Sequence, residues 1–200
     1  MKLTRLLFFL SFVLLLSCDK ESKEKETPPP DNYQPVTDFS IWTYSEYPST
    51  ALYSIRITGW DTTFNKKKYT EMFSTLHGYS YFRKEAGNYY IMFPDDTLTE
   101  LLYLKDRGLT GDNWEQKVAV SGFDATLKYK ITARDIESLV NGVIYKEVIT
   151  VRRDTWVDFG TGSDSLVSSE LGSYANNVGL ILIDKGIDKV YLSHYQIYPE

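Results

Sequence analysis

Cysteine and histidine are scarce in this sequence, which has one cysteine and two histidines in 200 residues. A single cysteine cannot form a disulfide within the chain, so packing must stabilise the folded part. His77 and His194 have no partners at the spacing of a metal motif such as H-E-x-x-H, so each is interpreted as a hydrogen-bonded structural residue. The composition therefore predicts no metal site and no cofactor.

The sequence also lacks an apolar run long enough to cross a bilayer, which requires about 20 residues. Its main apolar run, residues 6–16, is interrupted by Ser11 and preceded by Lys2 and Arg5. A basic start followed by a short apolar core is typical of a signal peptide. Residues 1–17 are therefore predicted to direct export.

The end of this segment, Leu15-Leu16-Ser17-Cys18, resembles the lipobox of bacterial lipoproteins. The resemblance implies cleavage between Ser17 and Cys18 and attachment of acyl chains, such as palmitate, to Cys18. Two or more chains hold a protein stably on a membrane. Acylation of Cys18 would leave no free thiol for catalysis. The alternatives are an ordinary secretory signal with a chance cysteine and an uncleaved anchor.

A polar spacer follows the cysteine. Residues 19–26 include no apolar side chain and cannot bury enough surface to fold, and residues 28–30 are three prolines that favour a stiff extended chain. We therefore expect a signal peptide at 1–17, a lipidated cysteine with a charged, proline-rich tether at 18–38, and one β domain at 39–200. About 160 residues suffice for a single domain with a sizeable core.

Charge constrains the location and the partners. The charged residues after Cys18 resemble surface-export signals of Bacteroidetes-type lipoproteins, whereas Asp19 alone resembles the inner-membrane retention signal of enteric bacteria. Because the charged run continues beyond Asp19, we predict an outer-membrane lipoprotein facing the periplasm or the cell surface. Without Lys2 and Arg5, 20 basic residues face 27 acidic ones, a net charge of about −7 that argues against nucleic acid as a partner.

The rest of the chain has the pattern of an antiparallel sheet. Aromatic residues make up 15% of the sequence, and apolar and polar side chains alternate in several segments, such as 53–58, 127–132 and 189–194. Asn141-Gly142, Ala86-Gly87, Gly122 and Lys185-Gly186 provide turns between such segments. We predict an all-β fold of roughly ten antiparallel strands in sequential hairpins, with at most one or two short helices.

One segment fits two structures. Thr97-Leu98-Thr99-Glu100 resembles a helix capping box, and Leu98, Leu101 and Leu102 have helical spacing. Residues 99–104 also fit a strand. We favour the strand because the neighbouring segments on both sides are predicted strands.

Two short motifs carry a further resemblance. Gly111-Asp112-Asn113-Trp114 is similar to a GD-x-W step of uncharacterised Bacteroidetes-type envelope lipoproteins, and residues 174–181, YANNVGLI, are similar to a segment near their C-termini. The likeness covers roughly residues 79–197. It implies a curved sheet or incomplete barrel similar to periplasmic lipoprotein carriers, and it implies no activity.

Catalytic patterns are weak. There is no G-x-S-x-G motif and no glycine-rich phosphate loop between a strand and a helix. Glycoside hydrolysis needs two carboxylates that face each other, and the candidates are Asp95, Asp96, Asp154, Asp158 and Glu170. Each also fits a turn or a surface position. We therefore expect a protein that is not an enzyme, and a carboxylate-dependent hydrolase ranks third, after the two binding functions given below.

Aromatic side chains give the strongest binding signal. The candidate ligand-binding residues are Trp42, Trp60, Trp114 and Trp156, although any one of them also suits a sheet core. The leading hypothesis is a carrier-like pocket for a hydrophobic ligand. The alternative is a surface module that binds a glycan or an envelope protein. A large apolar pocket favours the first, and coplanar exposed aromatics favour the second.

Overall fold

The computed structural model describes residues 31–94, 99–120 and 122–199. All regular secondary structure in these ranges consists of β-strands. A compact unit spans Asp31–Glu200. The strands are β1 Ile41–Tyr47, β2 Leu52–Phe64, β3 Lys67–Ser74, β4 Gly78–Glu85, β5 Asn88–Met92, β6 Glu100–Lys105, β7 Asn113–Val120, β8 Phe123–Val140, β9 Val143–Asp158, β10 Asp164–Ala175, β11 Gly179–Asp184 and β12 Lys189–Gln196.

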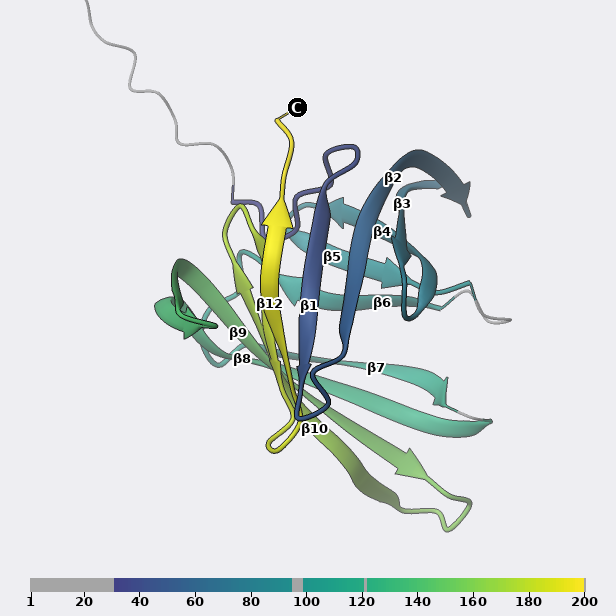
Figure 1. Ribbon diagram of the computed structural model, residues 1–200. Coiled ribbons are helices and arrows are strands. Elements are labelled where there is room, and N and C mark those ends of the chain that lie inside the picture. The colour runs from purple at the N-terminus through teal and green to yellow at the C-terminus, as the bar shows by residue number, and fades with distance from the viewer. Residues whose placement is uncertain (1–30, 95–98, 121, 200) are drawn as a thin grey trace, which may run out of the picture. The chain divides into compact units, whose positions relative to one another are not determined.

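All twelve strands form one antiparallel sheet that curls into a nearly closed barrel (Figure 1). The order is β6-β5-β4-β3-β2-β1-β12-β11-β10-β9-β8-β7, so nearly every strand pairs with its neighbour in sequence. The predicted all-β class and sequential hairpins are confirmed. The strand number is twelve, and the described residues include no helix, so none of them forms an apolar helix long enough to cross a membrane.

The turns lie where their residue types allow them. Asn141-Gly142, between β8 and β9, has φ values of 50° and 81°, and Ala86-Gly87, between β4 and β5, has 50° and 83°. These left-handed conformations suit two-residue hairpins that match the twist of the strands. Glu100–Lys105 is strand β6, which confirms the strand interpretation of this segment. Thr97 and Leu98, from the competing capping box, lie outside the described residues.

The alternation predicted from the sequence sorts side chains to the two faces of the barrel. On β8, Leu127, Tyr129 and Ile131 are buried inside, whereas Lys128 and Lys130 are exposed outside. Alternation places one face of each strand in a shared interior. The core draws on both halves of the chain and includes Trp42, Ile57, Phe82, Leu104, Val148 and Ile181.

Side chains, rather than a strand ladder, join the two edge strands β6 and β7. Trp114 Nε1 and Gln116 Nε2 on β7 donate to the carbonyl of Leu102 on β6, at 2.8 and 2.9 Å. The Leu102 amide donates to Gln116 Oε1 at 3.0 Å. Both backbone groups of Leu102 are therefore satisfied across the seam, which protects an otherwise open sheet edge.

Replacing Gln116 by methionine is expected to lower the free energy of unfolding by about 1 to 3 kcal/mol, because the Leu102 amide loses its partner at a half-buried seam. Urea unfolding measures the change. Glu115→Met is the matched control, because Glu115 is exposed on the outer face of the same strand. Equal effects of the two substitutions would contradict a role of Gln116 in closing the barrel.

Candidate functional site

The interior of the barrel is not completely filled. A cavity of about 540 Å³ lies inside it, within the usual range for small-molecule sites. Its apolar wall comes from inward-facing residues of several strands. These residues include Ile55 on β2, Met72 on β3, Ile91 on β5, Leu101 on β6, and Leu180 and Ile183 on β11.

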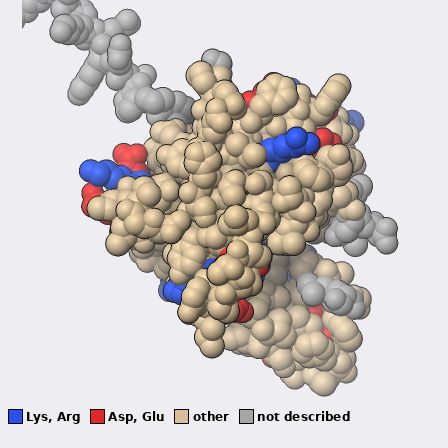
Figure 2. All heavy atoms as spheres, in the orientation of Figure 1, with Lys and Arg blue, Asp and Glu red and all other residues tan. Residues whose placement is uncertain are grey.

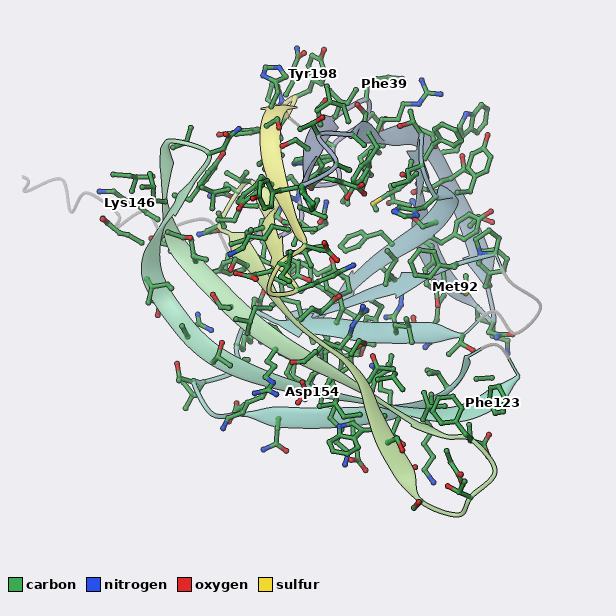
Figure 3. All side chains as sticks on the ribbon, turned by 60° about the horizontal axis from the view of Figure 1, so that its bottom comes forward. Phe39, Met92, Phe123, Lys146, Asp154 and Tyr198 are labelled. Atoms are coloured by element: carbon green, nitrogen blue, oxygen red, sulfur yellow. The ribbon has the colours of Figure 1, made fainter. Side chains whose placement is uncertain are left out.

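The cavity opens toward one end of the barrel. His77, Phe93 and Lys185 line it, and they lie in the β3–β4 turn, just after β5 and in the β11–β12 turn. Those positions all belong to the same end, because antiparallel neighbours place alternate turns at opposite ends. In Figure 3, Met92 at the end of β5 and Phe123 at the start of β8, both at this end of the barrel, lie on the same side of the view. We call this end the mouth.

The start of the compact unit closes the opposite end. Tyr33 is 1% exposed and its amide donates to the Tyr89 hydroxyl at 2.9 Å. The Asn32 carbonyl accepts from the Asn177 amide at 2.7 Å, in the β10–β11 turn. Gln34 then reaches the cavity wall. We call residues 31–36 the plug; they belong to the compact unit, which begins at Asp31.

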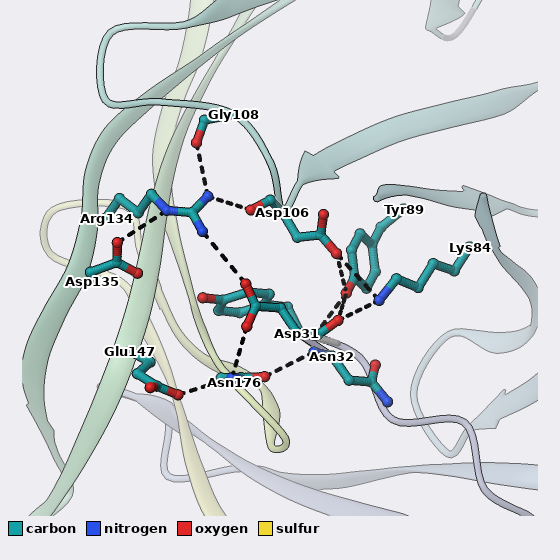
Figure 4. A network of polar contacts seen from close by, with 11 residues as sticks. Asp31, Asn32, Lys84, Tyr89, Asp106, Gly108, Arg134, Asp135, Glu147 and Asn176 are labelled. Atoms are coloured by element: carbon teal, nitrogen blue, oxygen red, sulfur yellow. Dashed lines mark hydrogen bonds and ion pairs between the residues drawn. The ribbon is translucent and has the colours of Figure 1, made fainter. Parts of the chain in front are cut away.

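Polar contacts hold the plug in place (Figure 4). Arg134 of β8 donates to the carbonyls of Asp106 and Gly108 and forms an ion pair with Asp31 at 3.6 Å. Lys84 of β4 lies 3.2 Å from the Asp106 carboxylate. These contacts connect the plug to the β6–β7 connection and to β4 and β8.

The motif residues at the closed end also support the plug. Asn176 accepts from the Asn32 amide at 2.8 Å and donates to Glu147 at 2.9 Å. The Val178 carbonyl accepts from Trp42 Nε1 at 2.7 Å. The role visible for this part of the C-terminal motif is therefore structural.

One wall of the cavity is polar. Arg153 on β9 and Glu170 on β10 face each other and form an ion pair at 2.8 Å. Lys185 lies 4.0 Å from the same carboxylate. Two cations against one acid give the cavity lining a net charge of about +1, because the remaining lining residues are uncharged except for the titratable His77.

Two buried polar atoms on this wall, the Tyr129 hydroxyl and Arg153 Nε, make no hydrogen bond of regular geometry with the described residues. Tyr129 is 3% exposed, and burial raises its pKa, while the charge of Arg153 and its hydrogen-bonding contact with the hydroxyl act in the opposite direction. Burial also raises the pKa values of Tyr103 and Tyr174, whose rings lie 5.7 Å apart beside it. Unpaired buried polar atoms are rare and costly. Asp106 Oδ1 and Trp156 Nε1 are also unpaired, but only Tyr129 and Arg153 line the cavity, which makes this wall the candidate binding surface.

Two of the four candidate tryptophans contribute to the interior. Trp42 is 1% exposed and lines the cavity. Trp114 lies at the seam, where its ring stacks on Tyr129 at 5.1 Å and an interplanar angle of 2°. Trp114 therefore supports the cavity wall through Tyr129.

The other two tryptophans lie on the outside. Trp156 is on the outer face of β9, where Lys128 sits 5.0 Å from its ring centre. Trp60 is 72% exposed, because an irregularity in the β2–β3 pairing separates it from the regular ladder. The structure does not bring the four tryptophans into one site.

Trp60 lines a groove of about 410 Å³ on the outside of the barrel, which we call the outer groove. It is lined by Phe39, Trp60 and Tyr79, together with Arg56 and Glu71. The aromatic surface continues to Phe73, whose ring meets Tyr79 at 5.0 Å and Arg56 at 5.5 Å. Figure 2 shows a face of the molecule with few charged side chains.

The carboxylate candidates do not form a catalytic pair among the described residues. Asp154 pairs with Ser169 on the outer face and Glu170 with Arg153 on the inner face, so the two acids lie on opposite sides of the sheet. Partial burial raises the pKa of Asp154, but hydrogen bonds from Ser169 and Arg152 lower it overall, unlike a general acid. Asp158 accepts from the amides of its own turn. Asp95 and Asp96 lie outside the described residues.

Neither histidine has a ligand-like setting. His77 packs edge-on against Tyr53 at 5.7 Å, and His194 is exposed on β12. No group of three or more acidic, histidine or cysteine residues in the described ranges could hold a metal ion. Ser17 and Cys18 lie outside those ranges.

Sequence reasoning missed the most informative pair of the cavity, Tyr129 and Arg153. The alternation in β8 placed Tyr129 on the apolar face, which was a usable signal for burial. Arg153 follows the same alternation on β9 as Val151 and Val157, so an arginine on an inward face was the signal that could have identified it.

Comparisons with known proteins give the fold alone. No model of a known protein family matches the chain, and no curated protein matches it. A crystal structure of a Parabacteroides distasonis protein described as an inferred lipoprotein shares the fold with a TM-score of 0.51 at 12% identity. The match covers 83% of this chain and 99% of that one.

Proposed function

We propose that this protein is a non-enzymatic, lipid-anchored lipoprotein of the bacterial cell envelope, and that its barrel binds a hydrophobic ligand. The observation that carries the binding role is the apolar cavity of about 540 Å³, which opens at the mouth and is closed by the plug. Burial of an apolar ligand in such a site is favoured in proportion to the apolar area removed from water. The lipobox-like residues before Cys18 and the fold shared with an inferred lipoprotein support the anchor.

The geometry of the barrel suits a tethered carrier. Asp31 begins the compact unit at the closed end, and Tyr198 returns to the same end, where its amide donates to Ser40 Oγ at 3.2 Å (Figure 1). A tether joined at Asp31 would attach to the barrel away from the mouth.

Filling the cavity is expected to weaken ligand binding. Ile183→Trp places a larger side chain in the cavity, and the binding of the neutral apolar dye N-phenyl-1-naphthylamine should weaken by about tenfold or more, since each 1.4 kcal/mol of lost burial is tenfold in affinity. Ile187→Trp is the matched control, because Ile187 is 80% exposed in the β11–β12 turn. Dye fluorescence measures both. Unchanged binding in Ile183→Trp would refute the cavity as the site.

The outer groove supports a second candidate, a surface module for a glycan or an envelope protein. Trp60 is 72% exposed beside Phe39 and Tyr79, with Arg56 and Glu71 available for hydrogen bonds. Large exposed aromatics mark interaction surfaces. Binding of a glycan or an envelope protein that is lost in Trp60→Ala and kept in Ile183→Trp would favour this function over the carrier.

A further inference from the structure

We infer that the ligand is an amphiphile, an alkyl chain with a small anionic headgroup such as a carboxylate, and that the headgroup binds Tyr129 and Arg153. This inference rests on the proposed carrier function and adds the chemical class of the ligand.

The geometry provides a compartment for the headgroup. A recess of about 40 Å³ lies between the rings of Tyr103, Tyr129 and Tyr174 and the side chains of Arg153 and Glu170. It is small compared with the cavity of about 540 Å³, with which it shares these residues. Gly172 makes room for it, because a Cβ there would lie 3.1 Å from the Tyr174 ring and hydroxyl. A headgroup of a few atoms matches this space.

The chemistry selects an acceptor. The Tyr129 hydroxyl and Arg153 Nε of the recess make no hydrogen bond of regular geometry, and both can donate. A carboxylate accepts two hydrogen bonds at once, and bonds to charged groups are the stronger kind. Glu170 already uses one carboxylate oxygen on Arg153, at 2.8 Å, and its other oxygen lies 4.0 Å from Lys185, so two cations offset its negative charge.

The same arrangement sets the direction of the chain. Glu170 precedes Leu171, which pairs with Asp184 at the mouth end of β11, so the charged wall lies toward the mouth. Trp42 and Leu180 line the cavity near the closed end. The headgroup therefore lies toward the mouth, and the alkyl chain extends toward the plug.

The test compares three ligands of equal chain length. The experiment uses the full chain with Cys18→Ala, so that no acyl chain of the protein competes for the cavity. The displacement of N-phenyl-1-naphthylamine is measured for laurate, dodecanol and dodecylammonium. Laurate should compete at about tenfold lower concentration than dodecanol, and dodecylammonium should be the weakest. This comparison needs no change in the cavity, so it does not depend on the folding of a variant.

Tyr129→Phe then locates the headgroup. The ring that stacks on Trp114 is kept and the hydroxyl is removed, so the advantage of laurate over dodecanol should fall by about tenfold. Tyr145→Phe is the matched control, because Tyr145 is buried on β9 and does not line the cavity.

Different results would contradict the headgroup site and the carrier function. Equal competition by the three ligands, or an advantage of laurate that survives Tyr129→Phe, would overturn the headgroup site and leave the apolar cavity standing. Dye binding that is insensitive to Ile183→Trp would overturn the carrier function itself.

Discussion

The Cys18→Ala variant is expected to carry no acyl chain and to leave the membrane fraction. Acyl chains contribute about 0.8 kcal/mol for each buried CH₂ group, so a protein held by two or more chains is stably bound and the same protein without them is not. Metabolic labelling with palmitate and fractionation of the cells measure the two effects. Palmitate labelling and membrane association should both fall from nearly complete to background.

Ser22→Ala is the control for this experiment, because it alters a small residue of the predicted tether and leaves the cysteine in place. Palmitate labelling that persists in Cys18→Ala would refute lipidation at this position. Labelling lost together with a membrane association that persists would instead support an uncleaved N-terminal anchor.

Alkaline pH is expected to destabilise the fold steeply. Burial raises the pKa of Tyr33 to about 12 and that of Tyr53 to about 12, and it raises the pKa values of Tyr44, Tyr89 and Tyr103 as well. An unfolded tyrosine loses its proton near pH 10. Above that pH the unfolded state binds fewer protons than the folded state, so the free energy of unfolding falls as the pH rises.

The size of this effect follows from the two numerical shifts. Each shift of about two units corresponds to about 2 to 3 kcal/mol, lost progressively between about pH 10 and about pH 12. Urea unfolding followed by circular dichroism between about pH 8 and about pH 11 measures the onset. A free energy of unfolding that stays constant through this range would contradict the burial of these hydroxyls.

Tyr53→Phe isolates one contribution. The ring stacks on Tyr44 at 5.3 Å, and phenylalanine keeps that contact while removing the ionisable hydroxyl, so the loss of stability above about pH 10 should become shallower. Tyr195→Phe, at an exposed position on β12, is the matched control. The two variants differ in burial and share the same chemical change.

The candidate site was less predictable from the sequence than the strands. Alternation at residues 127–132 predicted which side chains of β8 face inward, because side-chain direction in a strand depends only on local backbone geometry. The meeting of Arg153 with Glu170 depends on the register between β9 and β10. The contact between Asn32 and Asn177 joins residues 145 positions apart in the chain, and no local pattern encodes such a contact.

The four tryptophans show the same limit. Residue type identified them as candidates, but Trp42 is buried against the cavity and Trp60 is exposed in the outer groove. Trp60 points outward because the β2–β3 pairing is irregular between Ile57 and Asp61. The sequence contained the glycine of this irregularity, Gly59 with φ of 83°, and it did not show which side chain the irregularity would expose.

Residue type and short-range spacing were enough to predict the all-β class and the hairpin turns. The tertiary structure alone decided that the sheet closes through Gln116 and Trp114, that residues 31–36 plug one end, and that a polar recess opens beside Tyr129. Those features depend on strand register and on barrel closure, which bring together side chains that are distant in the chain.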